Sequence, residues 1–213
     1  MSGRRVIVIV VLAVASVVAG CGGTEQNAGE HHAKFPVSVA SSFPASQRLA
    51  ERTSFMVRIK NVGKQAIPDV AVTVLNPKYG SAAQAFGTLI KANSAGQPLL
   101  ASRSRPIWII NQAPGRCGYS CKNRGPGGAA TAYTNTWALG KLAPGHTAVF
   151  RWKLTAIQPG AYTVEYEVAA GLNGYAKAVT SGGSPARGSV AVHISSAPPS
   201  VTVKGNGQVT QNT

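Results

Sequence analysis

Apolar side chains recur at every second position in five stretches of the chain, and mostly polar or small side chains lie between them. These stretches are residues 54–60, 70–74, 148–154, 162–168 and 190–194. Each is bounded by Gly, Pro or Asn, and the pattern predicts strands with one buried face. Weaker stretches of the same kind are residues 37–39, 106–111 and 133–139.

No stretch keeps a sustained helical period, and the 13 prolines and 24 glycines separate strands rather than helices. Seven or eight short strands without intervening helices predict an all-β, antiparallel β-sandwich. We expect this domain to cover residues 36–195, with two long loops at residues 78–105 and 112–132. The composition of residues 196–213 predicts a disordered tail, within which residues 201–203 could instead pair as a last edge strand.

Two predicted strands, residues 147–155 and 161–169, are separated by only five residues. We therefore expect them to form a hairpin. Their outward faces carry opposite charges, namely Arg151 and Lys153 on the first and Glu165 and Glu167 on the second. Cross-strand ion pairs contribute about 0.2–1 kcal/mol each. Such pairing accounts for both glutamates without acid–base chemistry or calcium binding.

The first residues have the pattern of an export signal. Two arginines precede an apolar run at residues 6–19, which is too short to cross a bilayer and ends on Val18-Ala19-Gly20-Cys21. This ending resembles the lipobox of bacterial lipoproteins. The resemblance implies that residues 1–20 are removed and that Cys21 is diacylated, which would anchor the exported chain to the bacterial cell membrane. Residues 21–35 are polar and predict a flexible tether.

The chain is strongly basic, with 21 Lys and Arg against 6 Asp and Glu and a formal net charge of +15. Two basic residues leave with the signal, so the remainder carries 19 basic residues against 6 acidic ones, a formal +13. Export argues against nucleic acid as the partner. The charge favours anionic lipid headgroups or an anionic envelope polymer. A solvated surface that keeps the protein soluble is an equal alternative.

Cysteine parity bears on the second long loop. If Cys21 carries lipid, Cys117 and Cys121 remain as one pair, and an oxidising compartment favours a disulfide between them. So small a ring stabilises by at most about 2 kcal/mol and would stiffen the loop tip. The side chains of that tip form a cationic candidate partner-binding surface: Arg116, Tyr119, Lys122 and Arg124. An inert crossover is the alternative, and two cysteines alone predict no metal site.

The three tryptophans suit either carbohydrate stacking or a hydrophobic core. Trp137 and Trp152 lie at positions that favour the core. Trp108 fits either role, and we retain it among the candidate partner-binding residues.

Two segments combine strands and turns in a recurrent order. Residues 52–74 contain a strand, an Asn-Val-Gly turn and a second strand, and residues 139–168 contain Pro-Gly, a strand, Pro-Gly-x-Tyr and a further strand. Together they resemble the immunoglobulin-like modules of exported bacterial proteins, including the CARDB (cell-adhesion-related) type. The resemblance implies an Ig-like sandwich that serves adhesion or scaffolding and carries no chemistry. Tyr162, following Pro159-Gly160, also resembles a tyrosine corner.

Catalytic motifs are absent from the sequence. It contains no Gly-x-Ser-x-Gly, His-Glu-x-x-His or phosphate-binding loop, and neither His146 nor His193 has a visible acidic partner. We therefore expect no enzyme and no cofactor. The prediction is a lipid-anchored, non-catalytic binding, adhesion or structural module of the cell envelope, with an envelope protein or an anionic polymer as its partner. The alternatives are glycan or other soluble-ligand binding through residues 78–132, and an enzyme without a recognisable motif.

Overall fold

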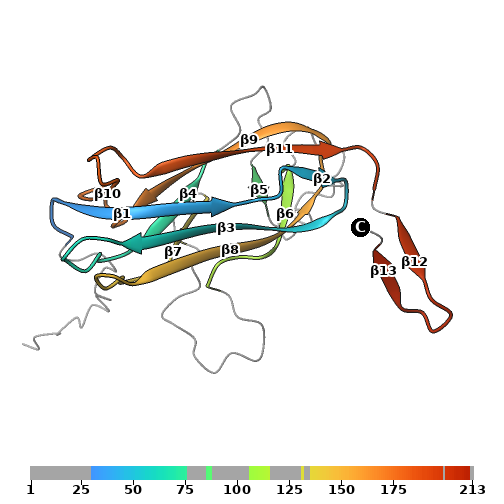
Figure 1. Cartoon of the computed structure of the whole chain (residues 1–213), viewed down its shortest axis with the longest axis horizontal. Coiled ribbons are helices and arrows are strands. Elements are labelled where there is room, and N and C mark those ends of the chain that lie inside the picture. The colour runs from blue at the N-terminus through green and yellow to red at the C-terminus, as the bar shows by residue number, and fades with distance from the viewer. Residues whose placement is uncertain are drawn as a thin grey trace, which may run out of the picture.

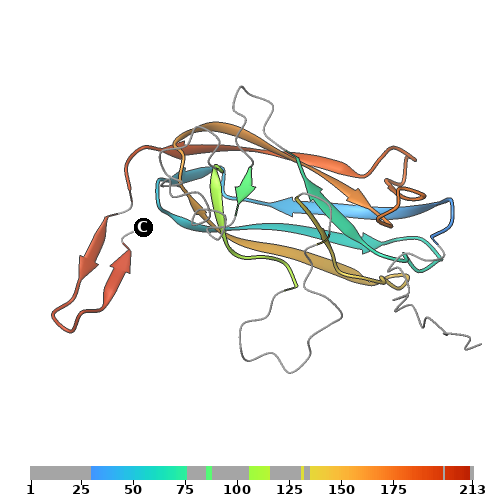
Figure 2. The ribbon, with the colours of Figure 1, turned by 180° about the vertical axis from the view of Figure 1, so that it is seen from behind.

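The computed structural model describes residues 30–75, 85–87, 106–115, 131, 135–198 and 200–211. Over these residues the chain is all-β and contains no helix. Eleven strands form two packed sheets and two more form a separate hairpin, as Figures 1 and 2 show from front and back. The predicted β-sandwich is therefore confirmed, with more strands than the seven or eight expected.

The first sheet has six strands in the order β10-β1-β3-β8-β6-β5. Their bounds are β1 Ala33–Ser42, β3 Arg52–Asn61, β5 Phe86–Gly87, β6 Trp108–Gln112, β8 Thr147–Ala156 and β10 Ala176–Val179. Strands β1, β3, β8 and β6 pair antiparallel, whereas the edge strands β10 and β5 pair parallel with β1 and β6.

The second sheet has five strands in the order β2-β11-β9-β4-β7. Their bounds are β2 Ser46–Arg48, β4 Ala71–Val74, β7 Thr136–Ala138, β9 Gly160–Ala169 and β11 Arg187–Ser195. Only β2, at the edge, pairs parallel with its neighbour. Both sheets are thus mixed rather than wholly antiparallel, because edge strands join after the chain has crossed between the sheets.

Strand pairing defines an immunoglobulin-like sandwich. The set β1-β3-β8-β6 corresponds to strands A, B, E and D of such a domain, and β4-β9-β11 corresponds to C, F and G. Strand β7 departs from that plan, since it lies beside β4 but follows β6 in the chain. The path from β4 to β8 therefore crosses between the sheets three times. The predicted loop of residues 112–132 falls between β6 and β7, in one of these crossings, whereas the predicted loop of residues 78–105 contains β5 and ends before β6 of the same sheet.

The core lies between the two sheets and is built from inward positions of the long strands. The alternation predicted for β3, β8, β9 and β11 matches their burial. Trp152 is fully buried and stacks on Phe55 with ring centroids 5.2 Å apart. Trp137 meets Trp152 edge-on at 5.3 Å. Both tryptophans are core residues, as predicted.

The hairpin predicted for residues 147–155 and 161–169 is wrong. Strand β8 pairs with β3 and β6 in the first sheet, and β9 pairs with β11 and β4 in the second. Arg151 and Lys153 therefore do not lie across from Glu165 and Glu167. The cross-strand neighbours of Glu167 are Arg187 on one side and Thr73 on the other.

A tyrosine corner closes the crossing from β8 to β9. The Tyr162 hydroxyl donates a hydrogen bond to the Pro159 carbonyl oxygen at 2.9 Å, which is the contact that the motif predicted. Gly160 has a φ of 144°, and a Cβ there would lie 2.9 Å from the Tyr162 hydroxyl. Glycine adopts this backbone conformation readily, whereas residues with a side chain rarely do. The conformation directs the chain to the second sheet instead of back along β8.

Asn61 joins two loops at the end of β3. Its buried Nδ2 donates to the carbonyl oxygens of Gln65 at 2.8 Å and Leu142 at 3.1 Å. Its Oδ1 accepts from the Gly63 amide at 3.0 Å. One side chain thus satisfies three backbone groups and holds the turn after β3 against the connection between β7 and β8.

The chain enters the domain through a docked carboxylate. Glu30 accepts hydrogen bonds from the backbone amides of Asn173 and Tyr175, both at 2.8 Å, and of Ala176 at 2.7 Å. Strand β1 begins at Ala33. Residues 30–35 therefore belong to the domain rather than to the predicted tether of residues 21–35.

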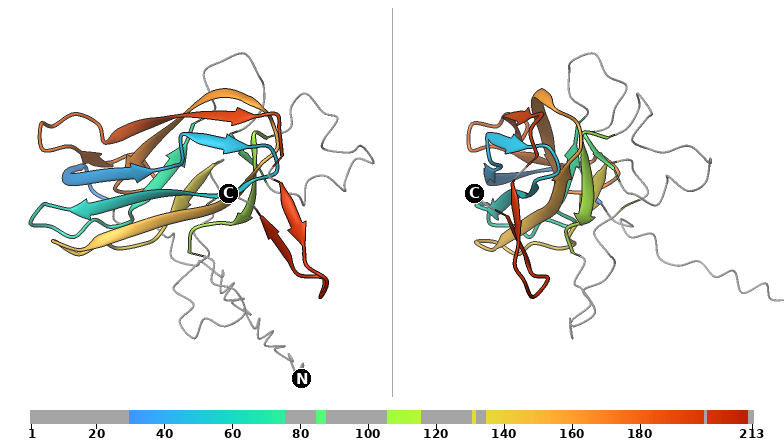
Figure 3. Two further views of the ribbon diagram at one scale, coloured as in Figure 1. Left: turned by 45° about the vertical axis from the view of Figure 1, so that its right-hand side comes forward. Right: turned by 90° about the vertical axis from the view of Figure 1, so that its right-hand side faces the viewer.

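The end of the chain forms a hairpin of β12 Val201–Val203 and β13 Val209–Gln211, which stands at one end of the sandwich (Figure 1; Figure 3, left). The Gly207 amide donates to the Lys204 carbonyl oxygen at 2.8 Å, and Gly207 has a φ of 80°. This is the turn chemistry of a short hairpin loop. The disordered tail predicted for residues 196–213 is therefore wrong over these two strands.

Candidate functional site

The two outer faces of the sandwich differ in charge. Outward positions of the six-stranded sheet carry seven exposed cations, and its strands contain no Asp or Glu. The cations are Lys34, Arg52, Arg58, Lys60, Arg151, Lys153 and Lys177. The outer face of the five-stranded sheet is balanced, with Arg48 and Arg187 against Glu165 and Glu167.

Five of these cations form a series that we call the cation ladder: Arg52, Arg58 and Lys60 of β3, and Arg151 and Lys153 of β8. The register pairs Arg52 with Thr155, Lys153 with Ser54, Arg151 with Met56, Arg58 with Val149, and Lys60 with Thr147. Each of five successive outward pairs therefore holds one cation and one uncharged residue. Successive pairs lie about 6.8 Å apart along the strands, so the ladder extends over about 27 Å.

This arrangement limits repulsion within the ladder. Like charges directly opposite each other destabilise an antiparallel pair, and no pair of the ladder contains two cations. Strands β3 and β8 are hydrogen-bonded on both sides, so the cations project from the interior of the sheet and not from its edge. The Arg151 guanidinium also rests against its cross-strand neighbour, with Nη2 3.8 Å from the Met56 sulfur.

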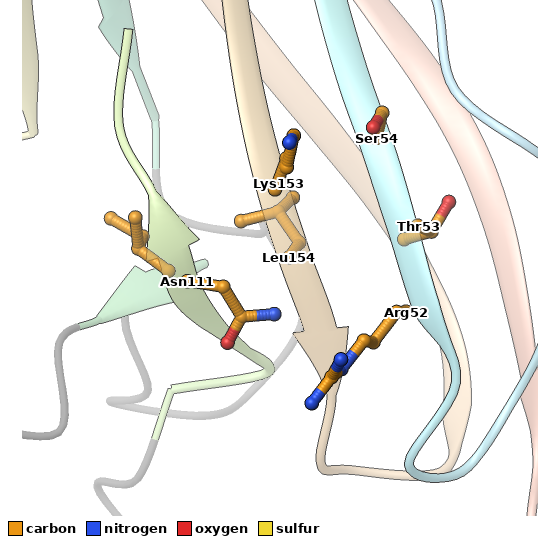
Figure 4. A pocket seen from close by; sticks show the side chains of 7 residues that line it. Arg52, Thr53, Ser54, Asn111, Lys153 and Leu154 are labelled. Atoms are coloured by element: carbon orange, nitrogen blue, oxygen red, sulfur yellow. The ribbon is translucent and has the colours of Figure 1, made fainter. Parts of the chain in front are cut away.

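A shallow groove of about 640 Å³ lies at the Arg52 end of the cation ladder (Figure 4). Its lining comes from β3, β8 and β6, and consists of Arg52, Thr53, Ser54, Ile110, Asn111, Lys153 and Leu154. A β-bulge between Ile110 and Gln112 frees Asn111 from the β6–β8 register. Asn111 Nδ2 donates to Thr155 Oγ1 at 2.7 Å. Amide, hydroxyl and cationic groups thus meet here, and together they suit an anion.

Asp69 is a buried carboxylate with a structural role. Its Oδ1 accepts a hydrogen bond from the Gly140 amide at 2.9 Å, whereas its buried Oδ2 has no hydrogen-bond partner among the described residues. Burial raises the pKa of Asp69 above 3.8; the Gly140 hydrogen bond opposes this effect, and the nearby charge of Glu30 adds to it. The carboxyl group fixes Gly140, whose φ of 80° turns the chain after β7.

Asp69→Asn is expected to flatten the pH dependence of stability. Because the pKa of Asp69 is higher in the folded state, that state binds more protons between pH 3.8 and the raised pKa. The free energy of unfolding of the wild type therefore falls as pH rises through this window, and the asparagine variant lacks that fall. Urea unfolding from acidic to neutral pH measures it, with Glu51→Gln as a control. Equal pH slopes for wild type and Asp69→Asn would contradict the assignment.

Trp108, named from the sequence as a candidate partner-binding residue, is a core residue. It is fully buried, and its Nε1 donates to Gln47 Oε1 at 2.8 Å. Its ring also packs on Phe43 with centroids 5.3 Å apart. Residues 106–109 are all buried, so the stretch around Trp108 shows no alternation, which explains why the sequence left its orientation open. Glycan binding through residues 78–132 therefore loses one of its proposed stacking residues.

The remaining sequence-predicted site residues lie outside the described residues. They are Cys21, Arg116, Cys117, Tyr119, Cys121, Lys122 and Arg124. Their lipidation, disulfide and partner-binding roles stay predictions.

Among the residues that the structure describes, no three His, Cys, Asp or Glu side chains are grouped so as to hold a metal ion. The same residues include no helix long and apolar enough to cross a membrane.

Sequence reasoning missed the cation ladder. The alternating Arg and Lys of residues 147–155 were visible, but they were paired with the glutamates of residues 161–169. The lack of any acid in residues 33–42, 52–61 and 147–156 was a signal that could have indicated a cationic face.

Fold and site together define an Ig-like β-sandwich domain with one cationic outer face. The sequence matches no family model, and a search of curated proteins finds no relative. Similar solved structures include a CARDB domain from Pyrococcus furiosus, solved in complex with di-metal ions, at 14% identity and a TM-score of 0.41. That match covers 76% of this chain and 96% of the other. The native alpha-2-macroglobulin of Escherichia coli matches at 10% identity and a TM-score of 0.40, over 78% of this chain and 7% of the other. With TM-scores this low, the strand pairing carries the fold assignment.

Proposed function

We propose that the protein is a lipid-anchored, exported, non-catalytic binding or adhesion module of the cell envelope, and that the outer face of its six-stranded sheet binds an anionic partner. The charge difference between the two outer faces carries this proposal. Seven cations without a single acid in the same strands attract anions strongly, over a range of about 8–10 Å at physiological ionic strength. The balanced face of the other sheet offers no comparable attraction.

The lipobox-like ending at Cys21 supports the anchor. Cys21 lies nine residues before Glu30, where the chain docks on the domain. Nine extended residues span at most about 32 Å, so a lipid on Cys21 would keep the domain close to the membrane. Two acyl chains give stable anchoring, whereas a single chain binds only marginally.

The anchor is tested by palmitate labelling and membrane fractionation in a bacterial host. We expect the wild-type chain to take the label and to appear in the membrane fraction. Cys21→Ala is expected to lose both properties, and Cys117→Ala serves as the matched control that retains them. A wild-type chain that takes no label, or that stays in the cytoplasm, would contradict the anchor.

The anionic partner is tested by cross-linking intact cells and by retention on purified anionic envelope polymer. We expect the polymer to retain the wild-type protein. It is not expected to retain a variant in which all five cation-ladder residues are changed to glutamine. Arg48→Gln combined with Arg187→Gln changes the other outer face and is expected to behave as wild type. If the polymer retains no wild-type protein and the cross-links capture only one specific protein, the anionic-polymer partner is wrong.

A further inference from the structure

We infer that the cation ladder binds a linear polyol-phosphate polymer, which lies along β3 and β8 with successive phosphates against successive cations. This inference rests on the proposed function and names the ligand class of the same face. It follows from the spacing of the cations, from the side chains between them and from what the face lacks.

The spacing favours a linear ligand. One cation occurs in each of five consecutive outward pairs, at intervals of about 6.8 Å. A compact anion would meet one or two of these positions and leave the others unused. A polymer with one phosphate in each short repeat can meet all of them in turn. Being flexible, such a polymer can also follow the twist of the two strands.

The side chains of the ladder suit phosphate. Three of the five cations are arginines, whose planar guanidinium groups bind phosphate oxygens in a bidentate manner. The uncharged partners include three hydroxyl donors, Thr147, Ser54 and Thr155. The other two, Met56 and Val149, present carbon surface between the cations, where the carbon atoms of a polyol repeat can pack.

The composition of the face argues against nucleic acid and against insertion into a bilayer. The outward positions of β1, β3 and β8 contain no Phe, Tyr or Trp on which a base could stack. They also contain no Leu or Ile, and their most exposed large apolar residue, Val149, is 41% exposed. A polymer that offers phosphates and aliphatic repeats fits this surface better than a nucleic acid or the interior of a bilayer does.

Synthetic glycerol-phosphate oligomers are the probes, titrated against the full chain in a non-ionic detergent. We expect a hexamer to bind and a dimer to bind far more weakly. For five phosphate contacts, the slope of log K against log salt is expected to be about −3.5, and each lost contact reduces its magnitude by about 0.7. Equal affinity for dimer and hexamer would overturn the linear arrangement.

Two variants that keep the net charge separate the effect of the cation arrangement from the effect of the total charge. Arg58→Val with Val149→Arg exchanges the members of one pair, so every pair keeps one cation, and hexamer affinity is expected to be unchanged. Arg151→Ser with Ser189→Lys moves one cation to the other sheet and leaves a gap, and affinity is expected to fall about five-fold. Unchanged thermal unfolding confirms that both variants are folded. Equal affinity of the two variants would overturn the ladder.

Comparator ligands test the phosphate-polymer class. The comparators are polyglutamate, an unstructured oligothymidylate and anionic phosphatidylglycerol vesicles. If any of them binds as tightly as the hexamer, the assignment of a phosphate polymer as the ligand class is wrong. If the hexamer fails to bind while purified envelope polymer still retains the protein, only this inference is wrong. If wild type binds neither, the anionic partner of the proposed function is wrong as well.

Discussion

Trp152→Ala is expected to lower the free energy of unfolding by about 3–5 kcal/mol. The indole is fully buried and lies among other rings, with centroids 5.2 Å from Phe55, 5.3 Å from Trp137 and 6.1 Å from Phe150. These rings are held by two sheets and cannot collapse into the space that alanine leaves. A typical domain has only about 5–15 kcal/mol of stability in total. Urea unfolding followed by circular dichroism measures the loss.

Two controls isolate the packing effect of Trp152. Val149→Ala alters an exposed position on the same strand, and its effect is expected to stay within about 0.5 kcal/mol. Trp152→Phe keeps a ring and removes the buried indole N–H, which has no hydrogen-bond partner among the described residues. It is therefore expected to cost clearly less than alanine. If phenylalanine costs as much as alanine, ring packing does not explain the role of Trp152.

Asn61→Ala is expected to cost about 3 kcal/mol, since it removes hydrogen bonds from three backbone groups at once. The contact of Asn61 Nδ2 with the Leu142 carbonyl oxygen is buried and joins segments 81 residues apart. After the substitution that oxygen still accepts from the Ile67 amide at 2.9 Å, which limits the cost at this group. Chemical unfolding measures the cost. Hydrogen exchange of the Gly63 amide, which donates to Asn61 Oδ1, is expected to become faster.

Two further substitutions test whether the hydrogen bonds of the Asn61 amide cause the effect. Asn61→Asp keeps an acceptor for Gly63 but turns a carboxylate toward the carbonyl oxygens of Gln65 and Leu142. We therefore expect it to be at least as unstable as alanine at neutral pH and to recover partly in acid, where the carboxyl group can donate. Asn111→Ala removes an exposed asparagine and is expected to change stability by less than about 0.5 kcal/mol. A negligible effect of Asn61→Ala would show that water replaces the amide.

The sequence predicted which side of each long strand is buried better than it predicted which strands pair. Alternation is a local property, so the inward positions of β8, including Phe150 and Trp152, could be read directly from residues 147–155. Pairing depends on the path of the connection. Residues 156–160 could reverse the chain within one sheet or carry it to the other, and the alternation is the same in both cases. The motif around Tyr162 held the information that decides between them.

The cation ladder could not be predicted without the alignment of β3 against β8. Along β3 the outward series is Arg52, Ser54, Met56, Arg58 and Lys60, which has two gaps. Along β8 it is Thr147, Val149, Arg151, Lys153 and Thr155, which has three. Neither strand alone is a regular series of cations, and only their antiparallel alignment fills every position. The orientation of Trp108 also escaped the local pattern, because its neighbours Ile107 and Ile109 are buried as well and leave no alternation to read.

The docking of Glu30 determines how tension on the N-terminal segment would reach the fold. Three N–H···O bonds converge on one carboxylate and would share a pull before any strand is stretched. Next in line is the pairing of β1 with β10, from Ala33 to Pro36. Strand β1 runs along the long axis (Figure 1), so a lengthwise pull shears these bonds together instead of opening them one by one. If the protein is held by its N-terminal end, the Glu30 hydrogen bonds and the β1–β10 pairing at the edge of one sheet would bear the force. The aromatic core would carry little of it.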